Sequence, residues 1–373
     1  MRPIMGDKTN TRDSVAHSEL ESSGAAPASG HEPGSARRAV SGGAVRVALQ
    51  LIRVGPFFML LVLCAVMASL TPLFLTGRNL TNLGYQSTAT VCLALGQLVV
   101  ILTRGIDISV GSIVGLVVVA GSILYADHLP VGLIILAMLA LGAGAGAANG
   151  LLLVKGRLPH PFIVTLATLG IIEGIAFLWS GGVVLSGQPP LFYTLGEGKI
   201  RPVPWATILA IALAGLTWIV TKRMQWGRWI YAIGGNPEGA KRVGIPVGAV
   251  LVSVYVFSGV MAAFAGVVTA GQIGVGDANA GALFELNAIA AVMIGGASFL
   301  GGRGSVSNAV VGAITVTVIT NGLELQNISG NWQEIAIGGI ILVAVEVNVL
   351  RDYLEGRFRL MQAAAADHGG ASS

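Results

Sequence analysis

Apolar residues along this chain gather in runs near the twenty residues that a helix needs to cross the roughly 30 Å hydrocarbon core of a bilayer. Short segments between the runs carry the charges and many of the glycines and prolines. The pattern predicts an all-α fold, a polytopic membrane helix bundle of about ten transmembrane helices. The expected spans cover residues 56–75, 85–103, 108–126, 130–154, 161–180, 203–221, 247–272, 284–301, 305–323 and 332–350.

Two of the expected connections are very short, one over residues 104–107 and the other over residues 301–304. Both contain glycine, which lets the backbone turn through conformations that other residues rarely adopt. Each connection is interpreted either as a tight reversal between two spans or as part of a broken or re-entrant helix. The sequence leaves both interpretations open.

Composition supports a membrane location. Of 373 residues, 54% are hydrophobic and 11% are charged, whereas soluble domains carry about 25% charged residues. The net charge of +4 comes from basic residues that lie between the apolar runs, so we expect no nucleic-acid partner. Cys64 and Cys92 fall inside apolar runs and are expected to be small buried hydrophobic residues, not a disulfide or a metal pair. No metal site is predicted.

The ends of the chain differ from its apolar centre. Residues 1–45 are rich in Ser, Gly, Ala, Pro and mixed charge, with few large apolar side chains. Such a segment buries too little surface to offset the entropy of ordering, which predicts a disordered cytoplasmic tail. It lacks the short apolar core of a secretory signal. The expected transmembrane domain covers residues 46–355, and residues 356–373 form a second loose tail.

Lysine and arginine in the expected loops indicate the orientation of the chain. With the N-terminus inside, the cytoplasmic loops and the C-terminal flank hold twelve of the 22 basic residues, and the external loops hold three. Loops that remain in the cytoplasm are enriched in Lys and Arg. Both termini are therefore expected in the cytoplasm, which agrees with an even number of spans.

Glycines repeat at helical spacing in two of the spans. Gly142, Gly146 and Gly150 share one helix face, and Gly111 and Gly115 share another. Small residues let helices approach each other closely in lipid. We interpret both sets first as packing surfaces within the chain, with a dimer surface or a solute pathway as the alternative.

The segment 222–247, between the sixth and seventh expected spans, is the most informative one outside the spans. Asn236 is a favourable N-cap, Pro237 suits the first helical position, and Glu238 complements the positive end of the helix dipole. Gly244 stops the helix soon afterwards. These features predict a cytosolic helix of about two turns, which is marginal alone in water. It is interpreted as a lever docked on a soluble subunit, or more simply as a surface connector.

The chain lacks the usual glycine-rich loop that holds ATP. That loop needs Gly-Lys followed by Ser or Thr. The only lysine before such a residue is Lys8, which follows Asp7 in the N-terminal tail. We therefore expect a transport subunit that is not an enzyme, binds no cofactor of its own and is driven by energy from elsewhere.

Four segments resemble one family of membrane proteins. Residues 234–245 (GGNPEGAKRVGI) resemble the cytoplasmic coupling loop of ribose-type ABC transporter permeases, which take up carbohydrates. Residues 96–112 (GQLVVILTRGIDISVGS), 295–305 (GGASFLGGRGS) and 161–169 (PFIVTLATL) are similar to other segments of that family. The four segments occur in the order that the family has.

This resemblance implies the membrane-spanning permease subunit of a binding-protein-dependent ABC importer, multi-pass in the bacterial inner membrane. Such an importer brings a sugar or sugar-like solute inward, driven by ATP hydrolysis on partner subunits. The implied partners are an ABC ATPase subunit on the cytoplasmic face, an extracytoplasmic solute-binding protein, and a second permease copy or paralogue.

The resemblance also implies roles for individual residues. Those expected to couple the chain to the ATPase are Gly235, Asn236, Pro237, Glu238, Ala240, Lys241, Arg242, Gly244 and Ile245. Those expected in the signature turns of the family are Gly105, Ser109, Gly111, Gly301, Gly302, Arg303 and Gly304.

Three features depart from the family's pattern. Arg104 stands where a small residue is expected, and Lys241 and Arg242 make the coupling segment more basic than usual. Asn287 occupies the place of a common acidic residue. These differences weaken any transfer of a particular substrate from the family to this chain.

Polar residues within the spans are candidates for the solute pathway, because polar groups at membrane depth usually face a cavity or a partner. The candidates are Gln97, Asp107, Asn149, Thr165, Thr168, Glu173 and Asn287. Helix packing is the simpler interpretation of the neutral ones. Asp107 is alternatively a cap of the third helix. Glu173, in mid-span, is expected to face an interior or a helix end.

The external segment 181–202 contains adjacent prolines and several glycines. It is interpreted as a gate or as a docking surface for the binding protein, with a plain connecting loop as the alternative.

Two rival functions remain. An ion-coupled secondary transporter of a small polar solute would be expected to carry more charges inside the membrane, whereas the charges here lie mostly near span ends. An intramembrane enzyme would need a nucleophile such as Ser109 or Ser298 beside a base. His128 and His160 lie at span ends, and neither is evidently paired with a serine.

Overall fold

The computed structural model describes residues 42–156, 160–200, 202–347 and 349. The chain divides into two units, residues 1–47 and residues 48–373. Most of the expected tails, 1–45 and 356–373, lies outside the described residues. Residues 42–45 are the exception, because they begin the first helix, α1 (Gly42–Leu70).

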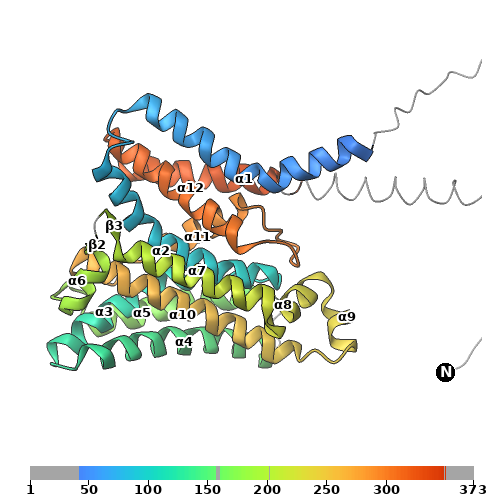
Figure 1. Cartoon of the computed structure of the whole chain (residues 1–373). Helices are drawn as coiled ribbons and strands as arrows, with labels where there is room; N and C mark the ends of the chain where they lie inside the picture. The colour runs from blue at the N-terminus through green and yellow to red at the C-terminus, as the bar shows by residue number, and fades with distance from the viewer. Residues whose placement is uncertain (1–41, 157–159, 201, 348, 350–373) are drawn as a thin grey trace, which may run out of the picture. The chain divides into compact units, whose positions relative to one another are not determined.

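Helices make up most of the described part of the second unit (Figure 1). After α1 come α2 (Gly77–Leu102), α3 (Val110–Ala126), α4 (Val131–Lys155), α5 (Pro161–Ser180), α6 (Pro190–Gly196), α7 (Trp205–Arg223), α8 (Gln225–Gly235), α9 (Pro237–Arg242), α10 (Val247–Ile273), α11 (Phe284–Ile294), α12 (Val306–Leu325) and a last helix, Gly330–Val347. The strands are β1 (Leu185–Ser186), β2 (Lys199–Ile200), β3 (Val203–Pro204) and β4 (Val275–Gly276). β1 pairs with β4 and β2 pairs with β3, both antiparallel.

The predicted fold class is confirmed. Within the described ranges, seven helices are long and apolar enough to cross a membrane: α2, α4, α5, α7, α10, α12 and Gly330–Val347. Three further apolar helices are shorter, namely Gly55–Leu70, Val110–Ala126 and Phe284–Ile294. Each of the ten expected spans therefore corresponds to an apolar helix. The number that cross the membrane and the side on which the termini lie stay predictions.

The eighth expected span is shorter than predicted. It was expected over residues 284–301, but α11 ends at Ile294 because a glycine-rich stretch follows, in which Gly296 and Gly301 adopt positive φ. Eleven helical residues extend about 16 Å, roughly half of the hydrocarbon core.

The segment that precedes α11 is not helical and runs along α3. Within it, Ala278 and Gly281 lie directly against Gly115 and Gly111, where a Cβ atom would collide with the backbone. Backbone outside a helix is tolerated at membrane depth only where protein or a water-filled cavity covers it. α3 covers the segment before α11 in this way. Whether residues 301–304 form a tight reversal or part of a broken or re-entrant helix stays a prediction.

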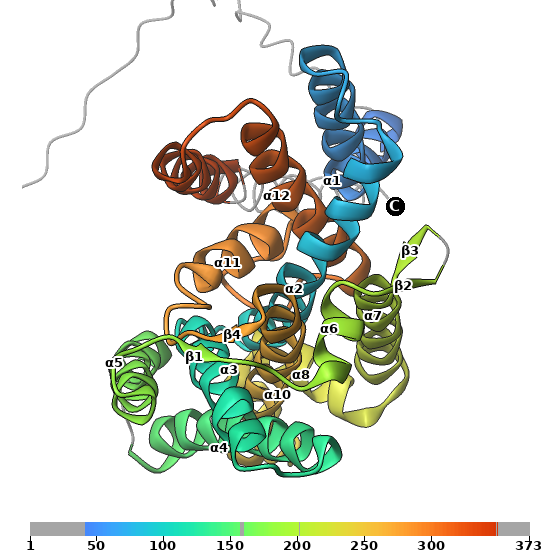
Figure 2. The ribbon, with the colours of Figure 1, turned by 90° about the vertical axis from the view of Figure 1, so that its left-hand side faces the viewer.

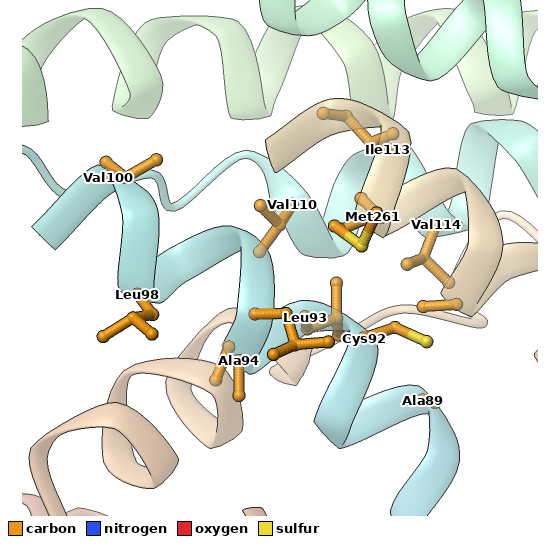
Figure 3. Packing of buried hydrophobic residues seen from close by; sticks show 14 of the residues in the cluster. Ala89, Cys92, Leu93, Ala94, Leu98, Val100, Val110, Ile113, Val114 and Met261 are labelled. Atoms are coloured by element: carbon orange, nitrogen blue, oxygen red, sulfur yellow. The ribbon is translucent and has the colours of Figure 1, made fainter. Parts of the chain in front are cut away.

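The core of the second unit forms around α2. In the most apolar stretch of α2, 78% of the residues are buried, whereas in the corresponding stretch of Gly330–Val347 only 6% are buried. Figure 2 shows α2 between α7, α10, α11 and α12. Figure 3 shows Leu93 of α2, Val114 of α3 and Met261 of α10 in the buried cluster that joins these helices. Cys92 lies in the same cluster and is fully buried, as predicted.

The glycines of α4 bring it close to α10. A Cβ atom on Gly142 would collide with the Gly259 carbonyl, and one on Gly146 would collide with the Tyr255 carbonyl. Helices in lipid gain stability from such close packing. The interpretation of this glycine face as a packing surface within the chain is confirmed.

Candidate functional site

The predicted short helix is present as α9, six residues long. The Asn236 side chain accepts a hydrogen bond from the backbone N–H of Gly239 at 2.9 Å, which caps the helix, and Pro237 follows as the first helical residue. At the other end, Gly244 has a φ of +84° and the Ile245 N–H donates to the Ala240 carbonyl at 3.1 Å. Only glycine adopts that φ without strain, so the chain can leave α9 sharply and enter α10.

The two faces of α9 differ. Ala240 is buried, whereas the side chains of Glu238, Lys241 and Arg242 are exposed. At one end of the bundle, α9 lies beside α8, and α6 and β2–β3 lie at the other end (Figure 1). The helix therefore presents charges to the surrounding solvent while a small apolar residue holds it to the chain.

A second helix, α8, precedes α9 and was not separated in the sequence prediction. Its buried residues include Ile230 and Ile233. The Trp226 indole donates to Ser253 of α10 at 2.7 Å, and the Tyr231 hydroxyl donates to the Gly304 carbonyl at 3.0 Å. Burial raises the pKa of Tyr231, so its phenol remains a neutral donor. These contacts hold α8 against the ends of the spans.

Three segments far apart in the sequence meet where α8 ends. The Gly302 N–H donates to the Leu102 carbonyl at 2.9 Å. Arg104 donates from Nε to the Gly234 carbonyl at 2.7 Å and from Nη2 to the Gly235 carbonyl at 2.8 Å. A Cβ atom on Gly234 would collide with the Leu102 carbonyl and the Gly302 N–H. We call residues 102–105, 231–235 and 301–304 together the turn junction.

The turn junction unites three of the four segments on which the family resemblance rests. Gly301 leaves space for the Arg104 side chain, and Gly105 leaves space for the Tyr255 hydroxyl. The Arg303 carbonyl accepts a hydrogen bond from the Ser298 N–H at 3.0 Å. The signature glycines outside α3 are therefore explained by close approach, which sequence spacing alone does not reveal.

A buried polar network begins three residues after Arg104. Asp107 accepts hydrogen bonds from the backbone N–H and the hydroxyl of Ser109 at 3.1 and 2.7 Å, and from the Ser258 hydroxyl at 2.9 Å. Asn149 donates to the Ser109 hydroxyl at 2.8 Å and accepts from Thr168 at 2.5 Å. These five residues, which we call the Asp107 network, join the start of α3 to α4, α5 and α10.

Four of the seven pathway candidates meet in this region. Asp107, Asn149 and Thr168 belong to the network, and the Thr165 hydroxyl donates to the Ile106 carbonyl at 3.1 Å. All four side chains are buried. The expected capping of α3 by Asp107 is indirect, because Ser109 is the N-cap residue and Asp107 bonds to Ser109 itself.

The side chains of the other three pathway candidates make no hydrogen bond to any described residue. The amide of Gln97 is fully buried, and neither its oxygen nor its nitrogen has a partner among the described residues. The same holds for the side-chain oxygen of Asn287. Glu173 is exposed on α5, so the expectation that it faces an interior or a helix end is wrong for the single chain.

Several contributors were missed from sequence. Ser258 and Tyr255 lie one helical turn apart on α10, and Asn79 and Asn321 exchange two amide hydrogen bonds at 2.9 and 3.0 Å. Gln188 donates to the Val118 and Val275 carbonyls and to the Ser122 hydroxyl, at 2.7 to 3.1 Å. For Tyr255, Ser258 and Asn321 the available signal was a polar residue within an apolar segment, whereas Asn79 and Gln188 lie in polar segments that gave no such signal. The sequence did not reveal the partners of these residues, because the partners lie on other parts of the chain.

A cavity of about 440 Å³ lies between α9 and the ends of the spans. Its lining includes Thr103 and Gly105 of the α2–α3 turn, Glu238 and Lys241 of α9, and Tyr255 of α10. Within the described ranges, no three His, Cys, Asp or Glu side chains gather closely enough to hold a metal ion.

These features describe a helix bundle in which, among the described residues, seven helices are long and apolar enough to cross a membrane. Comparison with known proteins gives its class, a transport permease. A family described as the permease component of a branched-chain amino acid transport system matches residues 79–345. No solved structure matches the chain.

Named relatives cover most of the chain. The galactose/methyl galactoside import permease MglC of Escherichia coli is 38% identical over 316 residues, 80% of this chain and 94% of the relative. The D-allose transport system permease AlsC of Escherichia coli is 36% identical, covering 79% of this chain and 91% of the relative. The ribose import permease RbsC of Haemophilus influenzae is 34% identical, covering 79% and 92%.

The chain belongs to this permease family. The resemblance to ribose-type carbohydrate permeases is thereby confirmed, as is the predicted location, multi-pass in the bacterial inner membrane.

Proposed function

We propose that the chain is the membrane-spanning permease subunit of a binding-protein-dependent ABC importer that brings a sugar or sugar-like solute into the cell. ATP is hydrolysed on partner subunits, and this chain binds no cofactor of its own. The similarity to three sugar permeases over about four fifths of the chain supports the solute class. An ion-coupled secondary transporter is the alternative, and none of the named relatives favours it.

The observation that carries this proposal is the exposed, charged face of α9. A helix of six residues is unstable alone in water, and α9 is held to its own chain by little more than Ala240 and its junction with α8. Its three charged side chains remain available to a partner. An ABC ATPase subunit that docks on α9 from the cytoplasm satisfies this arrangement.

The remaining partners follow from the same family. A solute-binding protein delivers solute at the opposite end of the bundle, where α6 and the paired strands β2 and β3 lie. A second copy of the chain, or a paralogue, completes the permease. Nucleic acid is not a partner.

For the solute pathway we propose the polar side chains that have no hydrogen-bond partner among the described residues. Sugar hydroxyls both donate and accept hydrogen bonds, so they suit the unpaired amide of Gln97, the oxygen of Asn287 and the exposed carboxylate of Glu173. The other candidates, Asp107, Asn149, Thr165 and Thr168, use their hydrogen-bonding capacity within the chain, and we propose that they hold the wall of the pathway.

Reconstitution tests the function. Proteoliposomes would contain this chain with its ATPase subunit and binding protein, and labelled D-galactose, D-allose and D-ribose would be offered with and without ATP. We expect ATP-dependent accumulation of at least one sugar, and none when this chain is reconstituted alone. Uptake of leucine in place of the sugars would overturn the solute class. Uphill uptake by the chain alone, driven by an ion gradient, would overturn the mechanism.

The role of α9 has its own test. Glu238→Lys reverses an exposed charge, and Gly244→Val places a β-branched side chain at a φ of +84°, which it cannot adopt without strain. Both variants should insert into the membrane normally and lose ATP-driven uptake. Exposed Arg78, at the start of α2, supplies the matched charge reversal Arg78→Glu, which should leave uptake unchanged. Normal uptake by both α9 variants would exclude α9 as the docking helix.

A further inference from the structure

Arg104 occupies an unusual position in the turn between α2 and α3. Its φ of +67° lies in the left-handed region, which disfavours any residue with a Cβ atom. The family is expected to have a small residue at this position. The arginine is therefore retained in a backbone conformation that glycine would adopt more easily, which calls for a compensating contact.

That contact is with the last turn of α8. The guanidinium donates to the carbonyls of Gly234 and Gly235 at 2.7 and 2.8 Å. The last carbonyls of a helix have no partner within it and carry partial negative charge, so a cation that donates two hydrogen bonds there is favourable. Asn236, the N-cap of α9, follows directly. Arg104 thus holds the point at which α8 passes into α9.

A cavity lies between α9 and the ends of the spans. The cavity of about 440 Å³ separates Pro237, Glu238 and Lys241 of α9 from Thr103 and Gly105 of the α2–α3 turn. The firm contacts between this part of the chain and the α2–α3 turn are those of the turn junction.

The other end of the same turn is anchored in the Asp107 network. Two residues separate Arg104 from Asp107. Asp107 bonds to Ser258 of α10 and, through Ser109 and Asn149, to Thr168 of α5. The turn therefore links the end of α8 on one side to the inner parts of α4, α5 and α10 on the other.

We infer that Arg104 is a positioning residue for transport, which transmits displacement of α8 and α9 through the α2–α3 turn to the Asp107 network. This inference rests on the proposed function, because it takes α9 to be moved by an ATPase subunit. It adds a second connection to the covalent one, in which α9 continues directly into α10.

The substitution Arg104→Gly separates this role from folding. Glycine relieves the strain of the left-handed backbone, which offsets the loss of the hydrogen bonds that Arg104 makes, so the variant should unfold at about the same temperature as the native chain. It removes both hydrogen bonds to α8. Arg104→Lys keeps the charge but loses the fixed fork of donors. Its sugar uptake per ATP hydrolysed should lie between that of the native chain and that of Arg104→Gly. Asn327→Gly is the matched control, since Asn327 also has a positive φ, of 55°, in a turn away from the junction.

The measurement is sugar uptake per ATP hydrolysed in proteoliposomes that hold the complete transporter, with the thermal midpoint of each purified complex. For Arg104→Gly we expect ATP hydrolysis to continue and uptake per ATP to fall about tenfold, a common size for coupling between sites. Asn327→Gly should match the native chain.

The outcomes separate the two proposals. If the native complex imports sugar and Arg104→Gly imports equally well per ATP, the inference about Arg104 is wrong and the proposed function stands. A lower thermal midpoint that accounts for the loss of uptake would also overturn it, because the role would then be structural. If the native complex shows no ATP-driven uptake, both proposals fail.

Discussion

The Asp107 network and the outer face of α5 each hold one carboxylate, but the surroundings of the two carboxylates are opposite. In the network, every polar side chain bonds to a neighbour on another part of the chain. On the outer face of α5, Glu173 is exposed in mid-span, and the space around Gly170 and Gly174 is open.

This difference separates polar side chains whose hydrogen bonds hold the fold together from polar side chains that remain available to bind solute, water or another subunit. A buried polar side chain is tolerated when its hydrogen bonds are satisfied. A carboxylate exposed to lipid is costly, so in the assembled transporter Glu173 requires water, solute or another subunit beside it.

The largest effect is expected for Asp107→Leu. It leaves the hydroxyls of Ser109 and Ser258 without their acceptor, and each stranded buried group costs roughly 1–3 kcal/mol. We expect a strong fall in the thermal midpoint of the detergent-purified protein and poor yield. Asp107→Asn keeps an acceptor and should lose less. A Leu variant as stable as the native chain would show that the network does not hold the bundle.

A smaller effect is expected where α4 crosses α10. Gly146→Ala places a methyl group against the Tyr255 carbonyl, and overpacking of this kind typically costs 1–3 kcal/mol. Gly144 lies on the same helix with nothing within 4 Å, so Gly144→Ala is the matched control and should be neutral or slightly stabilising. Equal thermal midpoints for the two variants would argue against the close packing of α4 on α10.

A still smaller effect is expected for Asn321→Ala. The variant removes the paired amide contact with Asn79, and hydrogen bonds between membrane helices are worth about 0.6 kcal/mol on average. Thr320→Ala is the control, because the Thr320 hydroxyl bonds to carbonyls of its own helix. The prediction is a slight decrease in thermal midpoint for Asn321→Ala alone. A decrease in thermal midpoint as large as that of Asp107→Leu would show that the Asn79–Asn321 contact is one of the main stabilising contacts of the fold.

On stability, Glu173→Gln should have almost no effect, because the carboxylate makes no hydrogen bond in the part of the chain that the structure describes. Sugar uptake by the complete transporter should nevertheless fall, since the proposed pathway loses a charged acceptor. Glu334, exposed near the start of the last helix, supplies Glu334→Gln as a control with unchanged uptake. Full activity of the Glu173 variant would remove it from the pathway, and a large loss of thermal stability would move it to the other side of the comparison.

Hydropathy predicted the helices well because the length of an apolar run is a property of one segment. The ends of α4 and α5 agree with prediction to within a residue. α11 was overestimated because glycines at positive φ end the helix inside an apolar run. The cap of α9 was predicted correctly, since Asn236 and its partner Gly239 are three residues apart.

Hydrogen bonds between segments far apart in the chain could not be predicted from the sequence. Asn149 and Thr168 were recognised as polar residues in apolar runs, but whether they faced solute or each other depended on how α4 and α5 pack. The departure at Arg104 was visible, yet its meaning required the position of Gly234, 130 residues away. Glu173 was misplaced because a single span does not reveal which of its faces the rest of the chain covers.

The pairing of β1 with β4 limits where the outer segment accepts an inserted epitope or fluorophore. Leu185 pairs with Gly276, and Gln188 bonds to α3 and to Val275. An insertion between Leu185 and Gln188 would pull on the stretch that leads into α11. Val183 and Val184 are exposed and precede the pairing, so they are the better sites for a reporter that must leave the permease undisturbed.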